Sequence, residues 1–141
     1  MERTLIILKP DCVKRHLCGE VLSRFEKAGF RIAAMKMAKL SHSILSEHYA
    51  HLKEKPFFPS VLEFMSSTPV IIAILERENA VEEVRRMCGA TDPKKADKGT
   101  IRADLALSTQ ENVIHASDSR ETAEKEIKRF FRAEEIHAYP N

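Results

Sequence analysis

The chain has 141 residues, of which 43% are hydrophobic and 31% charged, a composition typical of a globular protein rather than of a disordered or fibrous chain. Its 23 Lys and Arg against 21 Asp and Glu give a net charge of +2, which is too small to indicate nucleic-acid or membrane binding by itself. We expect one domain over residues 1–141, because no linker, repeat or low-complexity tract divides the sequence.

The cysteines and the apolar runs bear on location. Cys12, Cys18 and Cys88 form neither a C-x-x-C pair nor a zinc-ligand pattern, so we expect free thiols. No apolar run approaches the ~20 residues of a membrane span, and the amino terminus lacks the pattern of a secretion signal. The sequence therefore favours a reducing, cytoplasmic location and no membrane partner.

The beginning of the chain predicts two strands separated by a helix. Residues 4–8 are a continuous apolar run typical of a buried strand, and Pro10 ends it. Apolar residues then recur at helical spacing over 17–28, before Gly29. Residues 30–40 mix apolar and basic side chains with imperfect alternation, which indicates a half-exposed strand.

Two helices are predicted next. Residues 43–52 have helical periodicity with Ser43 as the capping residue. A proline-rich break precedes a second helix that begins near Pro59. Phe57 and Val61 lie four residues apart beside the inward stripe of that helix, and we expect this pair to line a groove.

A strand, a helix and a loop follow. Residues 70–75 predict a strongly apolar strand, and Asn79 is expected to cap a helix with Glu82 at its third position. Gly89 is suited to the end of that helix. Residues 90–104 have little periodicity and several basic residues, which indicates an ordered or semi-ordered basic surface loop.

The stretch 112–119 places an imidazole, that of His115, where a strand ends and a helix begins. The residues at 117–119 read Ser-Asp-Ser, three N-cap residue types in a row, and an amphipathic helical pattern follows. Backbone N–H groups at a helix start attract anions, and a neutral imidazole can act as a nucleophile toward phosphate. The pattern favours phosphoryl transfer through His115, although a structural histidine would also fit this local sequence.

Other side chains supply what such a transfer needs. Positive and hydroxyl groups that could hold phosphates are present at Lys9, Arg85, Thr91 and Arg102, although each alone is also typical of a solvated surface. Glu126, about two helical turns beyond Ser119, could orient the imidazole with Ser117 as a bridge. A solvated glutamate on a charged helix face is the alternative for Glu126.

Two familiar ways of binding phosphate are missing from the sequence. No glycine-rich Walker or kinase-type loop is present, and no metal-ligand cluster is visible. We therefore expect no metal site made by protein ligands, and any Mg²⁺ to arrive mainly coordinated by nucleotide phosphates.

The predicted element order is strand, helix, strand, two helices, strand, helix, loop, strand, helix. This order allows a parallel α/β sheet. It equally allows a ferredoxin-like βαββαβ antiparallel sheet with a helical insertion between its second and third strands.

Several segments taken together resemble the nucleoside diphosphate kinase family, in that family's order and through nearly the whole chain. These segments are Lys9-Pro10-Asp11, Arg24-Phe25-Glu26-Lys27 with Gly29-Phe30, His48-Tyr49, Lys55-Pro56-Phe57-Phe58, Gly89-Ala90-Thr91-Asp92-Pro93, Gly99-Thr100-Ile101-Arg102 and Asn112 to Ser119. The resemblance implies an α+β ferredoxin-like fold. It also implies ping-pong transfer, in which a nucleoside triphosphate phosphorylates His115 and a nucleoside diphosphate receives the group.

The same resemblance implies a role for each matching residue. The residues expected around the phosphates and sugar are Lys9, Tyr49, Arg85, Thr91, Arg102 and Asn112. It implies that Phe57 and Val61 sandwich the base, and stacking without base-edge hydrogen bonds explains broad base tolerance. It implies that Glu126 and Ser117 position His115, that Mg²⁺ is the cofactor, and that the protein is a homo-oligomer, a tetramer or a hexamer.

Several positions depart from the family pattern. Cys12 and Ala116 stand where glycine is usual, and Gln110 stands where glycine is usual near the sugar and base. His51 occupies a position where an acidic residue often helps to hydrate the metal, and Lys98 replaces a common proline.

A binding module without enzymatic activity is the competing hypothesis. From Arg85 to Arg102 there are six Lys or Arg against two Asp, so a local basic patch exists that nucleic acid could use. An aromatic content of 6% offers few stacking platforms, and nucleic acid is therefore expected to be at most a secondary partner.

Overall fold

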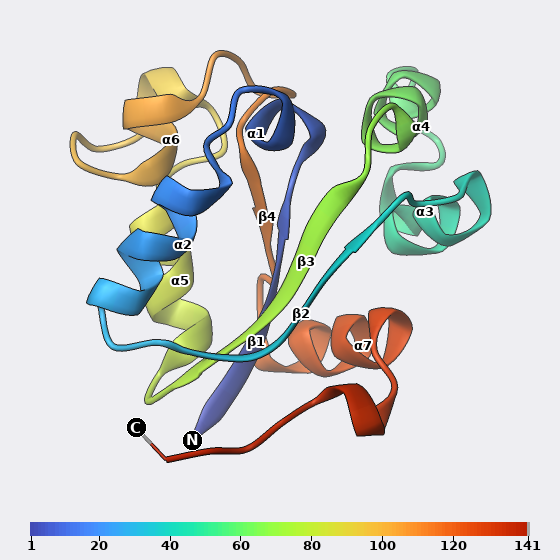
Figure 1. The fold of residues 1–141 in the computed structure, drawn as a ribbon. Helices are drawn as coiled ribbons and strands as arrows, with labels where there is room; N and C mark the ends of the chain where they lie inside the picture. Colours follow the sequence, from blue (N-terminus) through green and yellow to red (C-terminus); the bar gives the residue numbers. More distant parts are fainter. Residues whose placement is uncertain (141) are drawn as a thin grey trace.

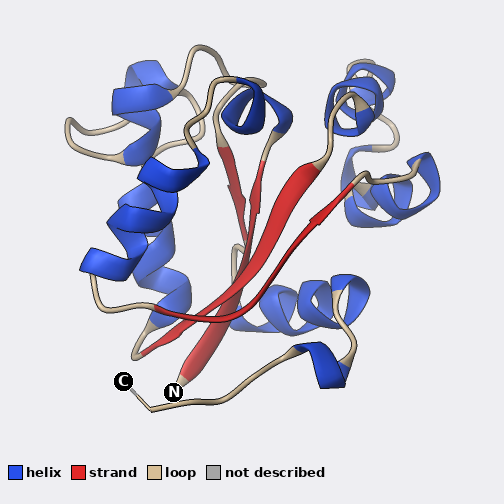
Figure 2. Cartoon of the chain, viewed as in Figure 1, coloured by secondary structure: helices blue, strands red, loops and turns tan. Residues whose placement is uncertain are grey.

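The computed structural model describes residues 1–140, in which four antiparallel strands form one sheet flanked by helices (Figures 1 and 2). The strands are β1 (Glu2–Leu8), β2 (Arg31–Ala38), β3 (Val70–Arg77) and β4 (Ile114–Ala116), in the order β2-β3-β1-β4. Each pair of neighbouring strands is antiparallel. This is the ferredoxin-like arrangement, and the parallel α/β alternative is wrong.

Within residues 1–140, six helices fill the connections between these strands, and a seventh follows β4. They are α1 (Pro10–Lys14), α2 (Cys18–Lys27), α3 (His42–His48), α4 (Phe58–Ser66), α5 (Ala80–Cys88), α6 (Ile101–Leu105) and α7 (Arg120–Phe130), with short 3-10 turns at Ala50–Leu52, Pro93–Lys95 and Ala133–Glu135. The expected helical insertion between the second and third strands is α3 with α4. Among residues 1–140, no helix is long and apolar enough to cross a bilayer.

The sheet has an apolar core on each of its faces. Side chains of β1 alternate between them, with Ile6 in the core that includes Phe25 of α2, and Ile7 in the core that includes Phe130 of α7. Helices α2 and α5 cover the first face, and α3, α4 and α7 the second (Figure 1). Because both faces are buried, residues 4–8 read as a continuous apolar run.

Two predicted helix caps are wrong. Ser41, not Ser43, caps α3, because its hydroxyl accepts a hydrogen bond from the N–H of Ile44 at 3.2 Å. Asn79 precedes α5 in the left-handed conformation with φ of 55° and makes no side-chain cap. The carboxylate of Glu2, on the neighbouring strand, accepts the N–H of Val81 at 2.7 Å instead.

Two short helices were not predicted. Pro10 ends β1 as expected but also begins α1, since proline lacks the N–H that a first helical turn leaves unpaired. Within the predicted loop, residues 101–105 form α6, and the hydroxyl of Thr100 caps it. The imperfect alternation of β2 has a structural cause, because its register shifts between Ile32 and Ala34.

Candidate functional site

His115 lies in β4, paired with Ile7 of β1, and its half-buried ring lines a cavity of about 660 Å³. The cavity lies between α3, β4, α7 and the segment around Thr91. Its lining includes eight of the residues predicted for the site, namely Lys9, Tyr49, Arg85, Thr91, Arg102, Asn112, His115 and Glu126. Residues from across the chain are therefore brought to one place by the fold.

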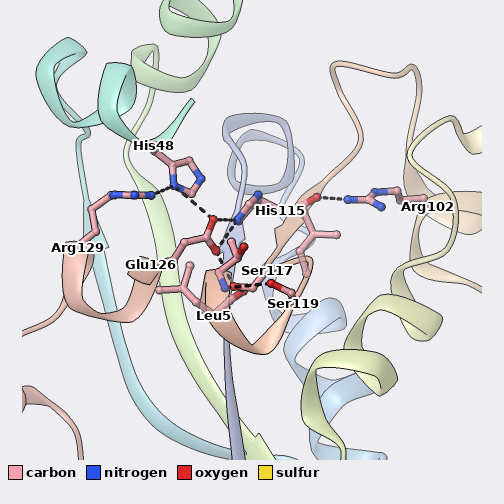
Figure 3. Close-up of polar contacts among 10 residues, drawn as sticks. Leu5, His48, Arg102, His115, Ser117, Ser119, Glu126 and Arg129 are labelled. Atoms are coloured by element: carbon pink, nitrogen blue, oxygen red, sulfur yellow. Dashed lines mark hydrogen bonds and ion pairs between the residues drawn. The ribbon is translucent and has the colours of Figure 1, made fainter. Parts of the chain in front are cut away.

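A buried carboxylate holds one nitrogen of the His115 ring (Figure 3). Nε2 of His115 lies 3.0 and 3.1 Å from the two carboxylate oxygens of Glu126, whose exposed fraction is 4%. The hydroxyl of the buried Ser117 donates to the same carboxylate at 2.5 Å. Because a carboxylate accepts hydrogen bonds, Nε2 carries the proton and Nδ1 keeps a free lone pair in the neutral ring.

Glu126 is the stable anion of this site. Burial alone would raise the pKa of its carboxyl, but hydrogen bonds from His115 and Ser117 and the electrostatic influence of the His115 and His48 rings lower the pKa below the ordinary value. The carboxylate is therefore available over the neutral pH range to fix the tautomer of His115.

Sequence reasoning missed two residues behind Glu126. His48 of α3 is buried, and its ring packs edge-on against that of His115 with 4.6 Å between the ring centroids. Arg129 donates from Nη1 to Nδ1 of His48 at 2.9 Å (Figure 3), and burial and neighbouring positive groups lower the pKa of His48 to about 3. His48 is therefore neutral, with its proton on Nε2.

The sequence contains a weak signal for His48 and Arg129. Arg129 follows Glu126 by three residues, so both project from one face of α7, and His48 was noted only within the His48-Tyr49 segment. The ligand atoms of His48, His115 and Glu126 lie within 4.8 Å of one another, as in metal clusters. The guanidinium of Arg129 beside His48 nevertheless opposes a cation at that point.

The positive groups of the cavity differ in their exposure and in the hydrogen bonds that they make within the protein. Lys9 donates to the side-chain oxygen of Asn112 at 2.7 Å, and burial, followed by the charge of Arg102, lowers the pKa of Lys9 to about 8. Arg102 is half-buried and donates to backbone carbonyls of Gly89, Asn112 and Ile114. Arg85 is exposed, so its guanidinium reaches solvent in the cavity.

The remaining predicted residues lie at different depths. Tyr49 is buried against the ring of His48, with 4.7 Å between the ring centroids, and burial followed by the charge of Glu126 raises the pKa of its hydroxyl. Phe57, 48% exposed, and Val61 are not among the residues that line the 660 Å³ cavity. They lie at the start of α4, and the structure does not bring them against His115.

The antiparallel sheet and this site define a ferredoxin-like α+β protein whose histidine faces a cavity lined with cationic side chains. A profile described as nucleoside diphosphate kinase matches residues 2–136, and the chain belongs to the nucleoside diphosphate kinase family. A nucleoside diphosphate kinase from Pyrococcus abyssi is 54% identical over an alignment of 142 positions, which covers 99% of this chain and 89% of that protein. One from Parabacteroides distasonis is 55% identical, with 99% and 91% covered.

Solved structures agree with this assignment. The Aquifex aeolicus nucleoside diphosphate kinase superposes with a TM-score of 0.92 at 43% identity, covering 96% of this chain and 98% of that one. A halophilic nucleoside diphosphate kinase from Halobacterium salinarum, solved in complex with CDP, has a TM-score of 0.96 at 36% identity. That superposition covers 99% of this chain and 93% of the other.

Proposed function

We propose that this chain is a nucleoside diphosphate kinase that transfers the terminal phosphate of a nucleoside triphosphate to a nucleoside diphosphate through a phosphohistidine at His115. The observation that carries the proposal is the hydrogen bond of His115 Nε2 with Glu126, which leaves Nδ1 as the nucleophilic nitrogen beside a cationic cavity. We assign the whole of residues 1–141 to this single catalytic domain.

The reaction has two half-steps at one site. In the first, the Nδ1 lone pair attacks the terminal phosphorus, the bond from phosphorus to the bridging oxygen breaks, and a nucleoside diphosphate leaves. In the second, a terminal oxygen of another diphosphate attacks the phosphohistidine, and the N–P bond breaks. Glu126 stabilises the positive charge that the ring acquires on phosphorylation, because its carboxylate faces Nε2.

The cavity residues hold the substrate during both steps. Lys9 and Arg102 line the cavity with His115 and neutralise the charge on the transferring group, so Lys9 acts as a catalytic residue as well as a binding one. Arg85, Thr91, Asn112 and Tyr49 contact the remaining phosphates and the sugar. Phe57 and Val61, outside the cavity, sandwich the base without reading its edges, which gives broad base and sugar tolerance.

Mg²⁺ is the proposed cofactor, held mainly by the nucleotide phosphates. The chemistry of the donor set fits this arrangement, because Lys9 and Arg102 line the cavity and the carboxylate of Glu126 already accepts hydrogen bonds from His115 and Ser117. When bound, the ion would reduce the negative charge of the phosphates, while Lys9 and Arg102 would position the terminal group.

The setting of the enzyme is inferred from the family resemblance. We expect a cytoplasmic homo-oligomer, a tetramer or a hexamer, acting on nucleoside di- and triphosphates. Nucleic acid is at most a secondary partner, since part of the local basic charge is already paired. Arg86 forms an ion pair with Glu83 at 2.8 Å, and the side chain of Arg102 bonds to the backbone.

A labelling experiment tests the proposed function. Incubation with γ-labelled ATP is expected to form an acid-labile, base-stable phosphoprotein, and later addition of GDP, UDP or CDP should release the label as the triphosphate. Absence of this phosphoprotein, or its failure to pass the label to any diphosphate, would contradict the mechanism. Salt-sensitive retention of DNA without phosphorylation would instead favour the nucleic-acid alternative.

Glu126→Gln is expected to slow phosphoenzyme formation about 10- to 100-fold while changing nucleotide affinity little, because its proposed role is orientation and charge stabilisation. Single-turnover labelling and nucleotide titration measure the two effects separately. Glu124→Gln, an exposed position on the same helix, is the matched control. An equal loss of rate and affinity would contradict the assigned role.

Phe57→Ala is expected to raise the KM for nucleotides about 10-fold and to leave kcat within about 3-fold, because a stacked base contributes about 1–3 kcal/mol to binding. Steady-state kinetics with ADP, GDP and CDP measure this effect and should show similar losses for all bases. Leu107→Ala serves as the control, because Leu107 is exposed and does not line the cavity.

A further inference from the structure

The backbone makes a strained turn immediately before His115. Val113 is fully buried and has φ of 76°, a conformation that a β-branched residue rarely adopts. The N–H of Ile114 donates to the carbonyl of Asn112 at 2.9 Å, so Val113 is the central residue of a γ-turn. Such a turn persists only where the surrounding structure holds it.

Asp11 of α1 supplies a hydrogen bond that holds this turn. Its carboxylate, in a side chain only 3% exposed, accepts the N–H of Val113 at 3.0 Å. The N–H of Lys9 donates to the carbonyl of Val113 at 2.9 Å, so the Lys9–Asp11 segment binds both the amide and the carbonyl of Val113. Among residues 1–140, the other carboxylate oxygen of Asp11 has no hydrogen-bond partner.

Outside its own backbone, the N–H of Val113 is the hydrogen-bond partner of the Asp11 carboxylate, and the charge of Lys9 also acts on it. Burial raises the pKa of its carboxyl, and the hydrogen bond from Val113 opposes that change. A buried carboxyl is unfavourable unless it is hydrogen-bonded, so the bond from Val113 offsets part of the cost of burying Asp11. α1 has only five residues, and the Asp11 carboxylate is directed at the turn across from it.

The turn connects two groups of the proposed site. Asn112, whose side-chain oxygen accepts a hydrogen bond from the ammonium of Lys9, immediately precedes Val113. His115 follows Val113 by two residues. Arg102 donates to the carbonyls of Asn112 and Ile114, on either side of the turn. If the Val113 peptide relaxed to a negative φ, the direction of the chain into His115 would change.

We propose that Asp11 is a positioning residue for the reaction: its carboxylate holds the γ-turn at Val113 and thereby sets the ring of His115 in the cavity. This inference rests on the proposed phosphorylation of His115. Asp11 is not among the residues that line the cavity, so it acts through the backbone and not on the reacting atoms.

The test combines Asp11→Ala with two substitutions at Val113. Asp11→Ala is expected to lower the single-turnover rate of phosphoenzyme formation at saturating ATP about 10- to 100-fold, the loss expected for a displacement near 1 Å. Asp11→Asn, whose amide oxygen can accept the same N–H, should stay within about 5-fold of the native rate.

The Val113 substitutions separate backbone strain from packing. Glycine adopts a positive φ without strain, so in a Val113→Gly background Asp11→Ala should reduce the rate less than about 3-fold. Val113→Ala removes nearly the same side chain but keeps the Cβ, so there Asp11→Ala should retain its full effect. Both backgrounds lose similar buried apolar contacts, which makes them matched controls.

Melting temperatures are measured for every variant. If Asp11→Ala does not fold, Asp11→Leu, which fills the buried position without an acceptor, takes its place. A native rate of phosphoenzyme formation in the Asp11 variant would overturn the inference. So would an Asp11→Ala effect that is reduced equally in the Val113→Gly and Val113→Ala backgrounds. If the native chain itself fails to form the phosphoprotein, the proposed function fails first, and the two outcomes are thus distinguishable.

Discussion

His115→Ala is expected to abolish the labelled phosphoprotein and to lower kcat by more than about 10⁴-fold, the scale seen when a nucleophile is removed. No neighbouring group takes over. His48 packs against His115, but its ring is neutral because its pKa is about 3. Nδ1 of His48 accepts the hydrogen bond from Arg129, so the single ring proton is on Nε2, which therefore has no lone pair to attack phosphorus.

Nucleotide binding should survive the loss of His115. In the proposed function the phosphates are held by Lys9, Arg102 and their neighbours, so the Kd for a nucleoside diphosphate is expected to change less than about 5-fold, measured by titration calorimetry. His42→Ala, an exposed histidine on α3, is the control. Residual phosphoprotein in His115→Ala would place the nucleophile elsewhere.

Lys9→Met is expected to reduce kcat/KM about 100-fold or more at pH 7, because it removes a positive charge that lines the cavity beside His115 and is proposed to face the transferring phosphate. In the native protein, the ammonium loses its proton as the pH rises through about 8, and polyphosphate binding favours the charged form. Nucleotide affinity should therefore fall above pH 8 in the native protein and change much less in Lys9→Met.

Above pH 8, the titration of Lys9 should raise the stability of the fold, whereas it lowers the affinity for nucleotides. The pKa of Lys9 is about 8 in the folded chain against an ordinary value of 10.5, so the unfolded chain binds the proton more tightly. This effect lowers the free energy of unfolding below pH 8, and stability is regained as the pH rises from 8 to 10.5. Urea denaturation of Lys9→Met should lack this rise, whereas the exposed Lys128→Met should keep it.

Local patterns in the sequence predicted the elements that local chemistry determines. Ser119 caps α7 as expected, accepting the N–H of Thr122 at 3.0 Å. The spacing from Ser119 to Glu126 correctly put Glu126 on the face that reaches His115. Gly89 ends α5 in a positive-φ conformation, which glycine alone adopts without strain.

Distant contacts explain what the sequence patterns missed. The N–H of Val81 in α5 is capped by Glu2 of β1, which lies 79 positions away in the chain, whereas the local pattern predicts Asn79 as the cap. The Arg129–His48 contact joins α7 to α3 across 81 positions of the chain. A γ-turn at valine contradicts the residue's own preference, so only the tertiary hydrogen bonds reveal it.

Strand direction was equally hidden from the residue pattern. Buried strands such as β1 are apolar on both sides in parallel and antiparallel sheets alike when helices cover both faces. Periodicity therefore left two topologies open, and the family resemblance indicated the antiparallel one. The observed register, with Ile7 opposite both Ile72 and His115, places the nucleophile beside the central strand.

The three carbonyls that Arg102 binds have a consequence for how nucleotides enter and leave. Movement of α6 away from the sheet would break bonds to Gly89, Asn112 and Ile114, each a charge-assisted bond of about 1.5–3 kcal/mol. These bonds oppose movement of the segment that carries α6. Nucleotides are therefore expected to enter and leave between the two half-steps while the Arg102 bonds stay in place.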